Sequence, residues 1–118
     1  MRILTGEQIL MRVFLGESDR YKGRPLYQEL VELFRREGIA GATVFRGIMG
    51  YGARSRIHTD HLLRLSQDLP VVIEVVDMRE NIDRVLPHLD ELPFDGLVTM
   101  EKVQVHKYGV APRGEKSE

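Results

Sequence analysis

The chain has 118 residues, a net charge of −1 and no cysteine. This length fits a single domain, and the near-zero charge provides no overall field to attract nucleic acid or an anionic membrane. The absence of cysteine excludes disulfides, thiolate metal sites and a cysteine nucleophile. No apolar run suits a signal peptide or a membrane span, so we expect a cytoplasmic protein that neither binds nucleic acid nor inserts into membranes.

The first half of the chain predicts a β-α-β unit. Residues 9–15 are apolar at nearly every position, which suits a strand buried on both faces. Apolar residues then recur at helical spacing between Pro25 and Gly38. Proline suits the first position of a helix and glycine its end, so this segment predicts the first helix. Residues 42–45 predict the second strand.

A second β-α-β unit follows a long connection. Residues 71–76 are β-branched except for Glu74 and predict a strand. A carboxylate there needs a partner or a raised pKa, which leaves a structural ion pair and a ligand contact as the two interpretations. Asp77 and Glu80 have the spacing of an N-cap and its partner, so they predict the start of the second helix. Pro87 predicts a kink in that helix or its early end.

The predicted order of elements defines an α+β fold. Residues 97–105 form the last strand, residues 1–110 a single domain, and we expect the tail at 111–118 to be disordered. Right-handed crossovers in two such units give a ferredoxin-like βαββαβ sandwich, a four-stranded sheet with both helices on one face. Because the strands are apolar on both sides, we expect a second copy of the chain to cover the bare face.

The glycine- and arginine-rich segment at residues 46–54 carries the strongest functional signal. Gly47, Gly50 and Gly52 permit positive φ and the close approach of a ligand to the backbone, where consecutive N–H groups can bind an anion. The neighbouring arginines, whose guanidinium groups suit phosphate, are Arg46, Arg54, Arg56 and Arg64. The spacing matches neither a Walker A motif nor a dinucleotide-binding motif, so a solvated flexible loop remains the alternative.

Two histidines lie in the same long connection. A short helix is predicted at residues 60–65 with Thr59 as its N-cap. His58 and His61 are spaced to share a metal on a helix, but no third ligand is evident. Unrelated polar roles in an exposed loop are therefore the alternative interpretation.

Several signatures in order resemble a prokaryotic family related to the PII signalling proteins, catalogued as domain of unknown function 190. The resemblance covers about residues 7 to 107. It rests on Gly16-Glu17-Ser18-Asp19, Gly41-Ala42-Thr43-Val44-Phe45-Arg46-Gly47, Gly50-Tyr51-Gly52, Ile57-His58, Leu65-Ser66-Gln67-Asp68-Leu69-Pro70 and Val75-Val76-Asp77. Several signatures in one order are far more specific than a single glycine motif.

The resemblance implies a ferredoxin-like fold, a PII-like homotrimer with inward-facing sheets, and a regulatory protein rather than an enzyme. An adenine nucleotide, AMP or ADP rather than ATP, would enter the cleft between subunits. The loop at residues 47–69 would then move and engage an unidentified partner protein. The nucleotide-binding residues carried over by position are Arg46, Gly47, Gly50, Gly52, Arg54, His58, Gly96 and Lys102.

Two other functions stay open. A small enzyme of the phosphatase or acylphosphatase type could use an arginine to hold a phosphoryl group, although no nucleophile is identifiable. A metal-binding trimer resembling the CutA proteins would rest on the histidines. The sequence therefore predicts no catalytic residue and no metal ligand.

Overall fold

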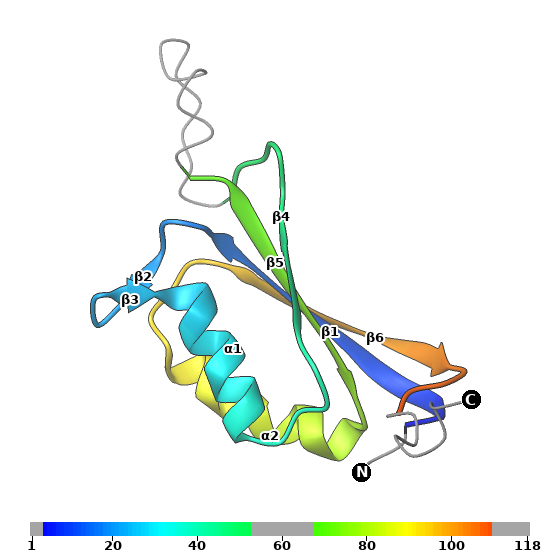
Figure 1. The fold of residues 1–118 in the computed structure, drawn as a ribbon. Helices are drawn as coiled ribbons and strands as arrows, with labels where there is room; N and C mark the ends of the chain where they lie inside the picture. The colour runs from blue at the N-terminus through cyan, green and yellow to red at the C-terminus, as the bar shows by residue number, and fades with distance from the viewer. Residues whose placement is uncertain (1–3, 53–67, 110–118) are drawn as a thin grey trace, which may run out of the picture.

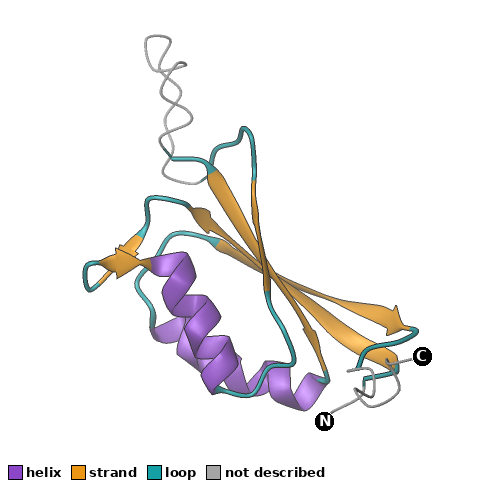
Figure 2. Ribbon diagram, viewed as in Figure 1, coloured by secondary structure: helices purple, strands orange, loops and turns teal. Residues whose placement is uncertain are grey.

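The computed structural model describes residues 4–52 and 68–109, and it has one four-stranded sheet with both helices on the same face (Figures 1 and 2). The elements are β1 (Gly6–Gly16), β2 (Arg20–Tyr21), β3 (Arg24–Pro25), α1 (Leu26–Arg36), β4 (Thr43–Arg46), β5 (Pro70–Asp77), α2 (Arg79–Glu91) and β6 (Leu97–Val105). The strand order is β4-β5-β1-β6, and all neighbours are antiparallel. This order confirms the predicted ferredoxin-like α+β fold.

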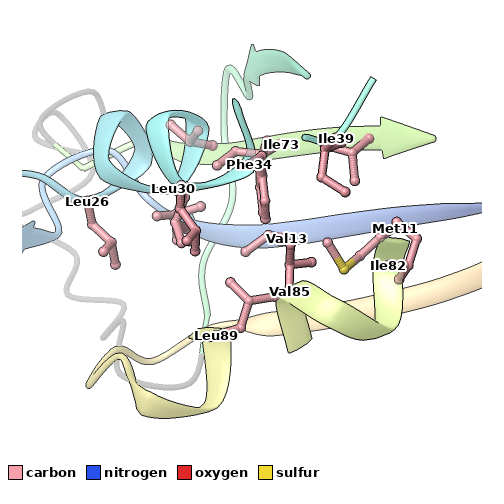
Figure 3. Close-up of a cluster of buried hydrophobic side chains, with 14 of the residues drawn as sticks. Met11, Val13, Leu26, Leu30, Phe34, Ile39, Ile73, Ile82, Val85 and Leu89 are labelled. Carbon is pink, nitrogen blue, oxygen red and sulfur yellow. The ribbon is translucent and has the colours of Figure 1, made fainter. Parts of the chain in front are cut away.

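The core lies between the sheet and the two helices (Figure 3). Alternate residues of β1 and β5 face the helices and are buried, in keeping with the two-residue period of a strand. The apolar stripes of both helices pack against them, as predicted. The labelled side chains of this cluster are Met11, Val13, Leu26, Leu30, Phe34, Ile39, Ile73, Ile82, Val85 and Leu89.

The second face of the sheet, which we call the open face, is not covered within one chain. Leu10, Phe14 and Val72 on this face are only half-buried, and Phe45 is 50% exposed. The prediction that residues 9–15 are buried on both faces is therefore wrong for the single chain, because both helices cross the same side of the sheet.

The helix ends agree only in part with the sequence patterns. α1 begins directly after Pro25, and Gly38 follows its end with φ +83°, as a helix-terminating glycine requires. The predicted N-cap role of Asp77 is wrong: Met78 occupies that position, and Asp77 ends β5 with its side chain fully buried. α2 runs to Glu91, so Pro87 does not end it early.

None of the helices in the ranges 4–52 and 68–109 is long and apolar enough to cross a bilayer.

Gly96 is required by the close approach of the turn before β6 to β1. A Cβ at this position would lie 2.4 Å from the carbonyl oxygen of Phe14 and 2.5 Å from the ring of Phe94. We expect Gly96→Ala to lower the free energy of unfolding by about 1–3 kcal/mol, because backbone or ring must move. Urea unfolding measures this change, with Gly52→Ala as control, since a Cβ there meets no described atom within 4 Å. Equal stability of the two variants would contradict the prediction.

Candidate functional site

The turn after β1 holds the first arm of the long connection between β4 and β5. The Arg46 guanidinium, at the end of β4, forms an ion pair with Glu17 in this turn. The amide of Gly47 donates a hydrogen bond to the carbonyl oxygen of Pro70 at 2.7 Å. The start of the connection is thus fixed both to the turn and to β5.

The same turn also holds the second arm. The amide of Glu17 donates to the carbonyl oxygen of Leu69 at 2.8 Å. The Ser18 hydroxyl and amide donate to Oδ1 of Asp68 at 2.8 and 3.2 Å. Residues 16–19 therefore clamp both ends of the predicted 47–69 loop, which a regulatory loop needs if movement at its base is to be transmitted.

The glycines at the start of the loop have a packing role. A Cβ at Gly47 or Gly50 would lie 2.7 or 2.9 Å from Cγ of Pro70, so these positions exclude a larger residue without any ligand. The expectation that Gly47, Gly50 and Gly52 use positive φ is wrong, because the proline ring rather than a left-handed backbone demands glycine at the first two. The glycines with positive φ are Gly6, Gly23 and Gly38.

A pocket of about 450 Å³ lies on the open face, toward the end of the sheet where β4 begins. This volume falls within the range of about 300–1,000 Å³ typical of small-molecule sites. Its lining residues are Leu4, Gly41, Ala42, Thr43, Glu74, Val76, Val105, Lys107 and Tyr108. They come from both chain ends of the domain and from the two strands at one edge, so only the folded chain creates the pocket.

The lining combines apolar walls with a few polar groups. Leu4, Val76 and Val105 supply apolar surface, whereas Glu74 and Lys107 supply opposite charges. β4 is an edge strand, so backbone N–H and C=O groups along its outer side are available for hydrogen bonds. Apolar walls with few convergent polar groups are typical of sites for small heterocyclic ligands.

Glu74 connects the pocket to the centre of the open face. Its Oε2 accepts a hydrogen bond from Nε of Arg12 at 2.8 Å, and Nη1 of Arg12 donates to Glu101 at 2.8 Å. The hydrogen bonds with Glu74 and then Glu101 hold the pKa of Arg12 above its ordinary value. The predicted structural ion pair is confirmed, within one chain. Because Glu74 also lines the pocket, a ligand contact remains open beside it.

The structure brings some of the predicted site residues together. Arg46, Gly47 and Gly50 lie at the loop base on the β4 edge, and Gly96 lies at the same end of the sheet on the β6 edge. Three strand spacings separate these two edges, which is about 14 Å. Gly52 lies farther along the loop and is exposed.

The other predicted residues lie elsewhere. Lys102 pairs with Ile9 across β1 and β6, on the helix side of the sheet, and its ammonium lies 3.7 Å from Glu7. It does not line the pocket. Arg54 and His58 lie outside the described residues, as do His61, the predicted short helix and the tail at 111–118.

Sequence reasoning missed most of the pocket. It assigned the chemistry to the loop, whereas the structure adds Gly41, Thr43, Lys107 and Tyr108 to a second site. The sequence offered two signals: the acidic Glu74 within an apolar strand, and the inclusion of residues 41–43 in the family signatures. No sequence signal pointed to the segment after β6.

Within residues 4–52 and 68–109, no group of three histidine, cysteine, aspartate or glutamate side chains is placed to hold a metal ion.

The fold is that of PII-like proteins. A crystal structure of a Thermus thermophilus protein described as PII-like in signalling has a TM-score of 0.61, 23% identity and 98% coverage of both chains. CPII from Thiomonas intermedia K12, a nitrogen regulatory PII-like protein, bound to ADP, AMP and bicarbonate, has a TM-score of 0.58 at 18% identity, covering 88% of this chain and 91% of CPII. CPII bound to ADP, AMP and acetate has a TM-score of 0.54 at 15% identity, covering 89% and 92%.

The chain belongs to the family called domain of unknown function 190 (DUF190, "Uncharacterized ACR"), whose model matches residues 8–105. The UPF0166 protein MJ1524 of Methanocaldococcus jannaschii is 43% identical over 99 residues, which cover 83% of this chain and 91% of that protein. A UPF0166 protein of Aquifex aeolicus is 41% identical over 96 residues, covering 81% and 90%. The family resemblance read from the sequence is confirmed.

Proposed function

We propose that this protein is a PII-like regulatory protein that binds an adenine nucleotide, AMP or ADP, in the open-face pocket. The observation that carries this proposal is the pocket itself, which combines apolar walls, a carboxylate and an edge-strand backbone around one volume. CPII, which shares the fold, is described as bound to ADP and AMP, and this supports the ligand class.

The lining suits the chemistry of adenine. The base has two apolar faces, which Val76 and Val105 would contact, and an exocyclic amino group that can donate to the carboxylate of Glu74. Guanine presents a carbonyl oxygen at the corresponding ring position, which the same carboxylate would repel. The pocket should therefore prefer adenine.

The phosphate groups would meet positive charge on either side. Lys107 lies at the pocket, and Arg46 lies three residues from Thr43 along β4, which is about 10 Å in an extended strand. Arg46 now pairs with Glu17, so a phosphate reaching it would compete with that carboxylate. Exchange of partners at Arg46 would loosen the clamp on the 47–69 loop and change its conformation.

Two subunits would complete the site. Arg46 and Gly96 lie on opposite edges of one sheet, so one ligand contacts both most directly where the edges of neighbouring chains meet. The uncovered open face, with Phe45 and Leu97 50% and 55% exposed, requires such a neighbour. We therefore include in the proposal a non-enzymatic homotrimer of one domain, residues 1–110, in the cytoplasm.

The remaining predicted contacts stay part of this proposal. Gly52, Arg54, His58 and Lys102 would approach the ligand on binding or from a neighbouring subunit. The 47–69 loop would present the ligand state to an unidentified partner protein, since a ligand shifts a conformational equilibrium only by its different affinity for the two states.

Thermal unfolding with AMP, ADP, ATP, cyclic AMP and GTP, each with and without Mg²⁺, tests the proposal. A ligand at a hundred times its Kd should stabilise the fold by about 2.7 kcal/mol, a shift of several degrees in Tm. We expect this shift with AMP or ADP and none with GTP, and a smaller shift in Arg46→Ala. No shift with any nucleotide, together with silent calorimetry, would contradict the proposed function.

A further inference from the structure

The segment after β6 turns back across the open face and is held by one tyrosine. The hydroxyl of Tyr108 donates a hydrogen bond to the carbonyl oxygen of Ala40 at 2.6 Å. Ala40 lies just before β4, and Tyr108 follows β6, so the bond joins segments beside the two opposite edges of the sheet. Residues 106–109, which we call the strap, thus pass over the end of the sheet where the pocket lies (Figure 1).

The acceptor of this bond is itself fixed to the core. The amide of Ala40 donates to Oδ2 of Asp77 at 2.8 Å, and the Asp77 side chain is fully buried. Ile39, the preceding residue, belongs to the hydrophobic core. The Ala40 peptide therefore offers Tyr108 a rigid attachment point, whereas Tyr108 is 40% exposed and has much less packing to hold it.

We propose that Tyr108 is a positioning residue: its hydroxyl fastens the strap over the pocket, holds Lys107 at the pocket, and links occupancy of the pocket to closure of the strap. The link to a nucleotide rests on the proposed function, whereas the fastening itself does not. Both Lys107 and Tyr108 line the pocket, as does Gly41 next to the acceptor peptide. A strap released from Ala40 would remove one wall and the ammonium group together.

Coupling of this kind is reciprocal. If closure of the strap raises affinity for the ligand, then the ligand must stabilise the closed strap by the same factor. The Lys107–Tyr108 peptide bond is a trypsin site within the strap, because trypsin cleaves after lysine. Its cleavage rate therefore reports opening of the strap with or without a ligand.

The test compares Tyr108→Phe, which removes only the hydroxyl, with Tyr27→Phe on α1, on the other side of the sheet. Without nucleotide, we expect trypsin to release the fragment ending at Lys107 about five to ten times faster from Tyr108→Phe than from wild type or from Tyr27→Phe, as loss of one hydrogen bond predicts. Mass spectrometry quantifies this fragment. Equal rates in all three proteins would overturn the proposal.

The second arm uses AMP and ADP. We expect either nucleotide to slow cleavage at Lys107 in wild type, and Tyr108→Phe to bind about five to ten times more weakly by calorimetry, with Tyr27→Phe unchanged. Equal affinity in wild type and Tyr108→Phe would overturn the link between strap and pocket. If wild type binds neither nucleotide but Tyr108→Phe is still cleaved faster, the proposed ligand fails and the fastening role of Tyr108 is supported.

Discussion

Replacing Glu74 with glutamine is expected to weaken binding of AMP or ADP about tenfold and to reduce discrimination against GMP. The carboxylate lines the pocket and can only accept hydrogen bonds, which suits the amino group of adenine and opposes the carbonyl of guanine. Glutamine keeps the size of the side chain but adds a donor and removes the charge, and a charge-assisted hydrogen bond is stronger than a neutral one by about 1 kcal/mol or more. Calorimetric titration with AMP and GMP measures both effects.

Glu101→Gln is the matched control for this prediction. Glu101 accepts the other hydrogen bond from Arg12 but does not line the pocket. If both variants lost the same affinity, the effect would arise through Arg12 and the open face rather than through contact with the ligand. Light scattering of both variants should show an unchanged oligomeric state, which separates a local loss of affinity from loss of assembly.

Asp77→Ala is expected to lower the free energy of unfolding by about 3 kcal/mol, because a fully buried carboxylate links three parts of the chain. Its Oδ1 accepts from the Met78 amide at 2.7 Å and from Nδ2 of Asn81 at 2.9 Å, and its Oδ2 accepts from the Ala40 amide at 2.8 Å. Alanine would leave these donors without that acceptor in the interior. Urea unfolding followed by circular dichroism measures the change.

The control for Asp77 is another aspartate near the same helix. Asp90 on α2 is exposed, so Asp90→Ala should change the free energy of unfolding by less than about 0.5 kcal/mol. Asp77→Asn, which keeps the size but not the charge, should lie between the two. A loss below about 1 kcal/mol in Asp77→Ala would show that other groups satisfy the three donors.

The sequence by itself determined the elements and their order. Residues 97–105 form β6 as predicted, and the helix predicted between Pro25 and Gly38 is α1. These features follow from local chemistry: the spacing of apolar side chains, the fixed φ of proline and the freedom of glycine. The family signatures, read in order along the chain, likewise needed no tertiary information.

Only the tertiary structure decided the roles of single polar residues. Asp77 has the spacing of an N-cap, but its acceptor oxygens serve Ala40, which lies 37 residues earlier. Glu74 pairs with Arg12 across 62 residues, and the pocket depends on Tyr108 reaching Ala40 across 68. A local pattern records the preference of a segment for helix, strand or turn, whereas these contacts arise when β-sheet register and chain return bring distant groups together. The loop glycines show the same limit, because packing on Pro70, rather than backbone conformation, requires them.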